Sequence, residues 1–245
     1  VWAPVATRLA ERFRVLVPDL AGHGTEAAGP VMTSIAAAAD DVKELLDAAG
    51  LDSVVLAGIS MGGAVAQEVA LRYPERVRAL ALVATMPKGS PLFDERAAAA
   101  EVQGLEAQIP MTLERWFGSG RVKANIEPVR YARDVLRRTD ISRWAAAWRA
   151  LAKHNAAMRL PSLTIPTLCI AGADDTSTPP SLVRSIAEML PQARMEVIAE
   201  APHLLTMTHS EDVAMLLNSL AADPVVERLG QVTADKTAMT FIPPS

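Results

Sequence analysis

The stretch that decides the fold is residues 53–63, with the sequence SVVLAGISMGG. The apolar, β-branched run at its start predicts a buried strand, and the residues from Gly62 to Tyr73 predict a helix. Between them lies Gly58-x-Ser60-x-Gly62. Small residues on both sides of a serine let a strand and a helix meet in a tight turn that exposes the hydroxyl. The pattern therefore predicts a nucleophilic serine, with a purely structural turn as the alternative.

The same alternation of strand and helix runs along most of the chain. It predicts strands at 14–18, 53–57, 78–84, 167–171 and 194–198, and helices at 34–49, 62–73, 180–190 and 211–221. Strands that alternate with helices form βαβ units. The sequence therefore predicts an α/β fold, with a mostly parallel sheet and helices on both faces.

The middle of the chain breaks this rhythm. Residues 87–160 contain no convincing strand, but helical stretches at 94–108, 127–138 and 143–152. We therefore expect four parts: the first part of a core (1–86), a helical cap (87–160), the second part of the core (161–222) and a tail (223–245). The tail has weak periodicity and is expected to be loosely held.

Composition narrows the class of protein. The 245 residues are 50% hydrophobic and 21% charged, with a formal net charge of −4. This is typical of a globular protein and argues against a nucleic-acid partner, which needs clustered basic residues. No apolar run reaches the ~18 residues of a membrane span, and the first residues lack a signal-peptide pattern. A cytoplasmic location is therefore expected. The single cysteine, Cys169, excludes an internal disulfide and lies in an apolar run, so a buried, inert thiol is expected.

A serine hydroxyl needs a general base, and the chain has four histidines. His203 follows a predicted strand, which places it at the same sheet edge as Ser60. His23 lies between two glycines and is expected to brace a loop. His154 lies in the cap, either on the surface or in a pocket, and His209 is expected to be solvated at a helix start.

The base in turn needs a carboxylate to fix its tautomer. Asp174 and Asp175 both follow the strand that ends at Ala171. We expect Asp175 to orient His203 and Asp174 to cap the loop. The N–H of Met61, at the start of the helix after Ser60, is predicted to face the oxyanion.

These motifs resemble the α/β-hydrolase fold superfamily over about residues 2–221. The elbow, the chain order Ser60, Asp175, His203 and the Gly22-His23-Gly24 loop carry the resemblance. Within the superfamily the chain is similar to the 3-oxoadipate enol-lactonase-like branch, chiefly through Arg115-Trp116-Phe117. The resemblance implies hydrolysis of an ester or enol-lactone of a small acidic metabolite, without a cofactor or metal.

Two features depart from that family. Its members carry strands and a His-Gly loop, the source of a second oxyanion donor, before the position of Trp2. We therefore expect an N-terminally truncated or partial chain, in which nothing fills the missing place. If the chain were the whole protein, its oxyanion hole would have one donor, Met61. Lys153-His154-Asn155 stands where relatives of this branch tend to have an aspartate, which weakens the case for a lactone substrate.

The cap is expected to roof a substrate pocket. The residues predicted to line it are Ile59, Trp116, Phe117, Trp144 and Trp148. The alternative for the last two, which lie four residues apart on one helix face, is that they pack the cap onto the sheet. Five arginines of the cap are candidates to bind a substrate carboxylate, and the alternative is that they lie on solvated helix faces. They are Arg115, Arg130, Arg133, Arg137 and Arg138.

The function predicted from the sequence is a serine hydrolase that cleaves esters or lactones through an acyl-enzyme. A carbon–carbon bond hydrolase and a perhydrolase-like enzyme use the same three residues and stay open. A dehalogenase is disfavoured, because it would carry Asp at the position of Ser60. A non-catalytic ligand-binding protein on this fold is the alternative from another class.

Overall fold

A six-stranded parallel sheet forms the centre of the molecule, which is a computed structural model describing residues 1–24, 29–229 and 237–244. The spatial order is β1-β6-β2-β3-β4-β5, and every paired strand runs parallel to its neighbour. Strands β2 to β4 are buried along their whole length because helices cover both faces. The strands are β1 (Arg14–Leu16), β2 (Val54–Ile59), β3 (Val77–Val83), β4 (Thr167–Gly172), β5 (Ala193–Ile198) and β6 (Ala238–Ile242).

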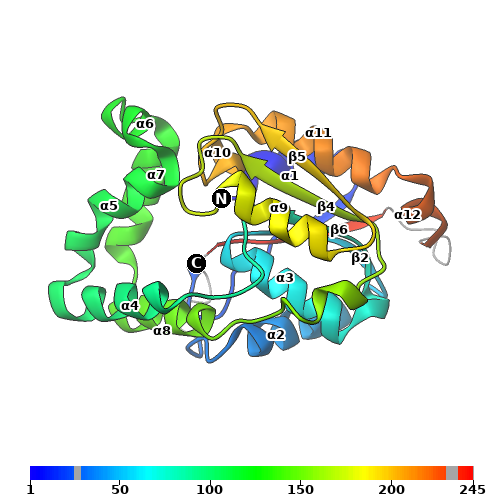
Figure 1. The fold of residues 1–245 in the computed structure, drawn as a ribbon, viewed down its shortest axis with the longest axis horizontal. Helices are drawn as coiled ribbons and strands as arrows, with labels where there is room; N and C mark the ends of the chain where they lie inside the picture. The colour runs from blue at the N-terminus through cyan, green and yellow to red at the C-terminus, as the bar shows by residue number, and fades with distance from the viewer. Residues whose placement is uncertain (25–28, 230–236, 245) are drawn as a thin grey trace.

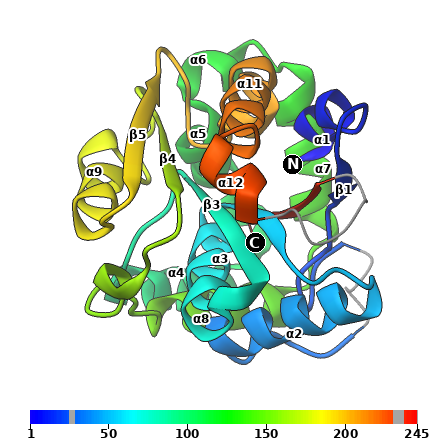
Figure 2. The same ribbon diagram turned by 90° about the vertical axis from the view of Figure 1, so that its right-hand side faces the viewer.

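Helices form a layer on each side of the sheet (Figure 2). Helices α1 (Ala3–Leu9) and α11 (Ser210–Ala221) pack together on one side. Helices α2 (Ile35–Ala48) and α3 (Met61–Arg72) pack together on the other, where α9 (Pro180–Met189) covers β4 and β5. The predicted α/β class is therefore confirmed. Two shorter helices, α10 (Leu205–Thr208) and α12 (Pro224–Leu229), flank α11 in the chain.

The segment between β3 and β4 is helical and projects from one end of the sheet (Figure 1). The predicted helix over 94–108 is in fact two helices, because Gly104 adopts a φ of 82° and ends the first. A positive φ is readily available only to glycine. The cap helices are α4 (Pro91–Gln103), α5 (Leu105–Phe117), α6 (Ser119–Lys123), α7 (Glu127–Arg138) and α8 (Ile141–Ala152).

The expectation that residues 223–245 form a loosely held tail is wrong for the part of this segment that the structure describes. Strand β6 lies inside the sheet, between β1 and β2, and all five of its residues are buried. Phe241 stacks on Trp2 with ring centroids 4.8 Å apart, and the indole N–H of Trp2 donates to the carbonyl of Ile242 at 2.9 Å. The sequence analysis also expected that nothing in this chain fills the place of the missing strands. That expectation is wrong for the position between β1 and β2, because β6 occupies it. The periodicity was weak because a strand buried on both faces shows no alternation of polar and apolar residues.

The two chain segments that lead into and out of the cap are joined to each other. The N–H of Gly89 donates to the carbonyl of His154 at 2.8 Å, and that of Ala156 donates to the carbonyl of Pro87 at 2.9 Å. Beside this junction, Arg159 forms an ion pair with Glu68 on α3. The cap is therefore held to the helix that begins next to Ser60.

His154 lies at this junction and is buried, so the expected surface position is wrong. It is also not among the described residues that line the cavity beside Ser60. Its side chain is 1% exposed, and Glu68 lies 3.6 Å from Nδ1. Among the residues that the structure describes, neither ring nitrogen has a hydrogen-bond partner. Burial lowers the pKa of His154 to about 4, because removal from water penalises the charged ring more than the Glu68 charge favours it, and Arg159 adds repulsion. The folded protein therefore holds this ring neutral.

None of the helices in the described ranges is long and apolar enough to cross a membrane. Cys169 lies in β4 and is fully buried, as predicted. Burial raises the pKa of its thiol to about 12, so the reactive thiolate is not formed at neutral pH.

We expect Phe241→Ala to lower the free energy of unfolding by about 3–5 kcal/mol, because it removes a fully buried ring from an interior strand of the sheet. Denaturant unfolding measures this loss. Val225→Ala is the control, since Val225 precedes β6 in the chain but is 45% exposed. Equal effects of the two substitutions would show that β6 does not lie in the sheet.

We expect the free energy of unfolding to fall as the pH drops from about 6.5 towards 4, by on the order of 3 kcal/mol from His154 alone. The unfolded chain binds the proton over this range and the folded chain does not, so acid favours unfolding. Denaturant midpoints measured across this range for the wild type and His154→Gln test the prediction. A variant that keeps the full slope would show that another group is responsible.

Candidate functional site

Ser60 occupies a strained turn between β2 and α3. Its backbone has φ 55° and ψ −119°, a conformation that is uncommon for any residue other than glycine. Two hydrogen bonds hold it there: the Ser60 N–H donates to the carbonyl of Val83 at 3.0 Å, and the Thr85 hydroxyl donates to the carbonyl of Ser60 at 2.6 Å. The strain is therefore maintained by contacts with β3 and the loop after it.

The two glycines of the motif are required by space. A Cβ atom on Gly58 would lie 2.1 Å from the carbonyl oxygen of Gly62. One on Gly62 would lie 2.2 Å from the carbonyl oxygen of Ile242 and 2.3 Å from that of Pro243. All three distances are far below van der Waals contact, so the turn can form only with glycine at these positions. The second glycine makes room for the end of β6.

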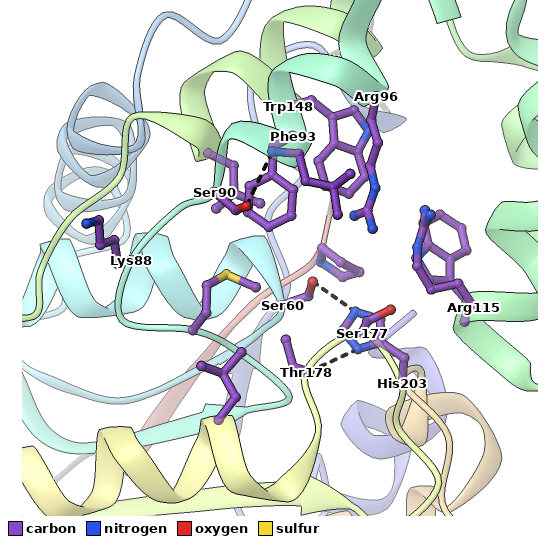
Figure 3. Close-up of a pocket in the computed structure, with 16 residues that line it drawn as sticks. Ser60, Lys88, Ser90, Phe93, Arg96, Arg115, Trp148, Ser177, Thr178 and His203 are labelled. Atoms are coloured by element: carbon purple, nitrogen blue, oxygen red, sulfur yellow. Dashed lines mark hydrogen bonds between the residues drawn. The ribbon is translucent and has the colours of Figure 1, made fainter. Parts of the chain in front are cut away.

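The side chains of Ser60, His203 and Asp175 form a continuous chain of hydrogen bonds. The distance from Ser60 Oγ to His203 Nε2 is 3.0 Å, and that from His203 Nδ1 to Asp175 Oδ2 is 2.8 Å. His203 and Asp175 are each 3% exposed. Figure 3 shows Ser60 and His203 directed towards each other, with a dashed line for the hydrogen bond between them. The structure thus brings together the three residues that the sequence singled out.

The loop after β4 folds around the Asp175 carboxylate. Oδ1 accepts the N–H groups of Ser177 at 2.7 Å and Thr178 at 3.0 Å, and Oδ2 accepts the Thr178 hydroxyl at 2.6 Å. Burial by itself raises the pKa of Asp175, but the charge and hydrogen bond of His203 and the bonds from Thr178 outweigh it, so the pKa is lowered. The carboxylate is therefore ionised beside His203.

Thr178 is a residue that the sequence analysis missed. Its hydroxyl lies 2.6 Å from Asp175 Oδ2 and 3.2 Å from His203 Nδ1. The Asp-x-x-Thr spacing, in which a hydroxyl can return to a carboxylate three residues earlier, was the available signal. Asp174, expected to cap this loop, is exposed, and the capping bonds go to Asp175 instead.

Two further histidines lie away from these contacts. His23 is half-buried and its Nδ1 lies 3.1 Å from the carbonyl oxygen of Ala21, which fits the predicted bracing of its loop. His209 precedes α11, as expected for a helix start, but it is half-buried and its Nδ1 contacts the Thr208 hydroxyl at 2.9 Å. The prediction that it is solvated is therefore only partly correct.

A cavity of about 310 Å³ opens between the cap and the end of the sheet. Ser60 and His203 line its core side, and aromatic residues from α4, α5 and α8 line its cap side (Figure 3). The described residues that line it are Ser60, Met86, Lys88, Ser90, Leu92, Phe93, Arg96, Arg115, Trp116, Trp148, Leu151, Ser177, Thr178, Leu182, His203 and Pro244.

Two of the predicted aromatic pocket residues, Trp116 and Trp148, line this cavity. Trp144 lies behind them, with its ring 6.4 Å from that of Trp116 and 5.7 Å from that of Trp148. Phe117 is not in the lining because it is fully buried. The contacts of α8 are mainly with α4, so the two tryptophans of α8 pack within the cap rather than onto the sheet.

Ile59 and Met61 also lie outside the lining, although both flank Ser60. Ile59 is fully buried in β2, and the Met61 side chain is buried as α3 begins. What Met61 presents is its backbone N–H, in the first turn of a helix, where N–H groups have no partner within the helix.

The predicted arginines divide into two groups. Arg115 lines the cavity, whereas the four arginines of α7 bond to groups of the cap itself; three of these are exposed and Arg133 is half-buried. Arg130 and Arg133 donate to Asn125, Arg137 pairs with Glu106, and Arg138 donates to the carbonyl of Asp134. A second cavity residue, Arg96, was not singled out by the sequence.

A parallel α/β sheet with a hydrogen-bonded Ser-His-Asp arrangement at the carboxyl ends of its strands defines a class of serine hydrolases. A family model described as the alpha/beta hydrolase fold matches residues 1–210. The chain belongs to this family.

Individual relatives agree with this assignment. The chain is 32% identical to the pimeloyl-acyl-carrier protein methyl ester esterase of Chromobacterium violaceum over 89% of this chain and 87% of that one. It is 29% identical to 3-oxoadipate enol-lactonase 1 of Acinetobacter baylyi over 86% of this chain and 79% of that one. The crystal structure of the enol-lactonase from Burkholderia xenovorans LB400 matches with a TM-score of 0.85 at 27% identity, over 91% of this chain and 86% of that one. The resemblance to the enol-lactonase-like branch is thus confirmed, and hydrolase activity is supported.

We expect Thr178→Val to lower kcat/KM for p-nitrophenyl acetate by about tenfold, because it removes a hydrogen bond to a buried, charged carboxylate. Thr178→Ser keeps the hydroxyl and should keep most of the activity. Thr176→Val, at an exposed position of the same loop, is the matched control. Full activity in Thr178→Val would show that the hydroxyl contributes nothing to the site.

Proposed function

We propose that this protein hydrolyses a carboxylic ester or lactone of a small molecule through an acyl-enzyme on Ser60. The observation that carries the proposal is the continuous hydrogen-bond chain from Ser60 Oγ through His203 to Asp175. The esterase and lactonase names of its relatives point to the same reaction class.

In the proposed first step, Ser60 Oγ attacks the substrate carbonyl while His203 Nε2 accepts its proton. The Asp175 carboxylate keeps the Nδ1 proton of His203 in place and stabilises the imidazolium that forms. The backbone N–H of Met61 donates to the oxyanion at the start of α3, where the helix dipole also favours negative charge. His203 then passes the proton to the leaving oxygen, and an acyl-Ser60 ester remains.

In the second step, His203 removes a proton from water, and the resulting attack releases the acid and restores Ser60. Both steps use only groups of the chain and water. Carbon–carbon bond hydrolysis and perhydrolysis use the same three groups, and analysis of the products distinguishes these reactions from ester cleavage. The volume of the cavity, about 310 Å³, fits a small substrate.

We expect Ser60→Ala to reduce turnover of p-nitrophenyl acetate by about 10⁴-fold or more, because the nucleophile is lost. A fluorophosphonate probe should label the wild type at Ser60 and leave the variant unlabelled. Ser162→Ala, at an exposed serine outside the cavity, is the control for folding and handling.

Two outcomes would overturn the proposal. Undiminished turnover in Ser60→Ala would assign the chemistry to another group. Absence of both turnover and probe labelling in the folded wild type would favour a ligand-binding protein on this fold.

A further inference from the structure

The backbone N–H of Met61, the proposed oxyanion donor, shares one peptide unit with the carbonyl of Ser60. A peptide unit is planar and trans, so its carbonyl and its N–H point in opposite directions. Whatever fixes the direction of the Ser60 carbonyl therefore also fixes the direction of the Met61 N–H. Met61 is the first residue of α3, where an N–H has no acceptor within the helix, so the helix holds this unit only by its carbonyl.

The Ser60 carbonyl accepts hydrogen bonds from two directions. The N–H groups of Gly63 and Ala64, in the first turn of α3, donate to it at 2.9 Å and 3.3 Å. The Thr85 hydroxyl donates to it at 2.6 Å, which makes this the shortest of the three bonds. The two helix donors direct the carbonyl into α3, and Thr85 approaches from the loop after β3. The Met61 N–H therefore points out of the N-terminus of the helix.

Thr85 reaches this carbonyl because its own position is fixed by the core. The preceding residue, Ala84, has a φ of 44°, and its N–H donates to the carbonyl of Ile170 in β4 at 2.8 Å. The side chain of Thr85 is fully buried and fills the space beside Gly63, where a Cβ atom on the glycine would lie 2.5 Å from it. The second of the two adjacent glycines after Ser60 is thus required to admit Thr85.

A second contact attaches the same loop to α3. The side-chain amide of Gln67 donates to the carbonyl of Met86 at 3.0 Å, and both residues are buried. Gly63 and Gln67 are four residues apart and so lie on one face of the helix. The loop is therefore held along this face at two points, and Thr85 is the point beside Ser60.

We propose that Thr85 is a positioning residue for the oxyanion donor: its hydroxyl holds the Ser60–Met61 peptide unit so that the Met61 N–H faces the developing oxyanion. This inference rests on the proposed function of the site. The bond resists rotation of the peptide unit, and by polarising the carbonyl it strengthens the N–H of the same amide as a donor. Thr85 is not among the described residues that line the cavity, so it acts through the peptide unit and not on the substrate.

The first test removes the hydroxyl and keeps the shape of the side chain. We expect Thr85→Val to lower kcat for p-nitrophenyl acetate by about tenfold, the range of one hydrogen bond. Loss of the donor itself would cost about 10²–10³-fold, and here the donor is weakened rather than removed. KM should change by less than about twofold, because the N–H stabilises the oxyanions of both steps and not the bound ester.

Matched variants assign the effect to the hydroxyl. Thr85→Ser keeps the hydroxyl and should retain most of kcat, whereas Thr85→Ala, which differs from it only by that group, should show the loss. This pair repeats the comparison if Thr85→Val does not fold. Thr240→Val is the control, because Thr240 is fully buried in β6 and its hydroxyl has no hydrogen-bond partner among the described residues. It should keep the kcat of the wild type.

The second test observes the Met61 N–H directly. When trifluoroacetone reacts with the enzyme, Ser60 Oγ bonds to the ketone carbon, the Ser60 proton passes to His203, and the ketone oxygen becomes an oxyanion. In protein labelled with nitrogen-15 methionine, the Met61 amide proton, assigned by its loss in Met61→Leu, should move downfield as it donates to this oxyanion. Thr85→Val and Thr85→Ala should reduce the shift, and Thr85→Ser should restore it.

The outcomes separate this inference from the proposed function. Hydrolysis that is undiminished in Thr85→Val and Thr85→Ala, or diminished equally in Thr240→Val, would overturn the role of Thr85 and retain the function. A loss of kcat with an unchanged Met61 shift would mean that Thr85 supports the nucleophile and not the oxyanion donor, which also overturns the inference. A wild type that neither hydrolyses the ester nor reacts with the ketone would overturn the proposed function and this inference with it.

Discussion

The strained turn at Ser60 is the constraint on which the rest of the site depends. A φ of 55° at a serine persists only where surrounding contacts fix it. Here those contacts come from β3, from the hydroxyl of Thr85, and from the close approach of α3 to the carbonyl oxygens at the end of β6. The hydroxyl of Ser60 is directed at His203 because the sheet on both sides of β2 holds the turn.

Short loops at the same edge of the sheet hold the other two residues of the site, Asp175 and His203, beside Ser60. Asp175 is held by N–H groups of its own loop, so its position does not depend on the cap. His203 is then set between a carboxylate and a hydroxyl that are each anchored independently. Two more residues with positive φ, Ala84 and Glu200, lie in the loops after β3 and β5. Three of the four described non-glycine residues with a positive φ, Ser60 among them, therefore lie where strands end, and the fourth, Asn125, lies between α6 and α7. Strained backbone is common at functional sites.

Local patterns in the sequence predicted the core of this arrangement. Ser60 was predictable because the turn that exposes its hydroxyl has space only for glycine at positions 58 and 62. His203 and Asp175 were predictable because each follows a strand of a parallel sheet, and such strands end at the same edge. Features set by contacts between distant segments were not predictable in this way. The position of β6 depends on pairing with β1 and β2, and the burial of His154 depends on Glu68 and on the pairing of the two cap connections. Arg96 has no local signature, and only the packing of α4 against α8 brings it to Trp148.

The position of β6 has a consequence for how the protein comes to be folded. Trp2 and Ile242, 240 residues apart in the sequence, are joined by a hydrogen bond. During translation, β6 is synthesised after every other described strand, yet its place is between two of the earliest. Until β6 has been synthesised, the edges of β1 and β2 that pair with it in the folded protein stay unpaired. Gly62 then also lacks the carbonyl group of Ile242 that packs against it. Closing so long a loop is entropically costly and slow. A nascent chain would therefore acquire its helices and cap before it acquires a finished site, and the unpaired edges would be exposed to chaperones or to aggregation during that interval.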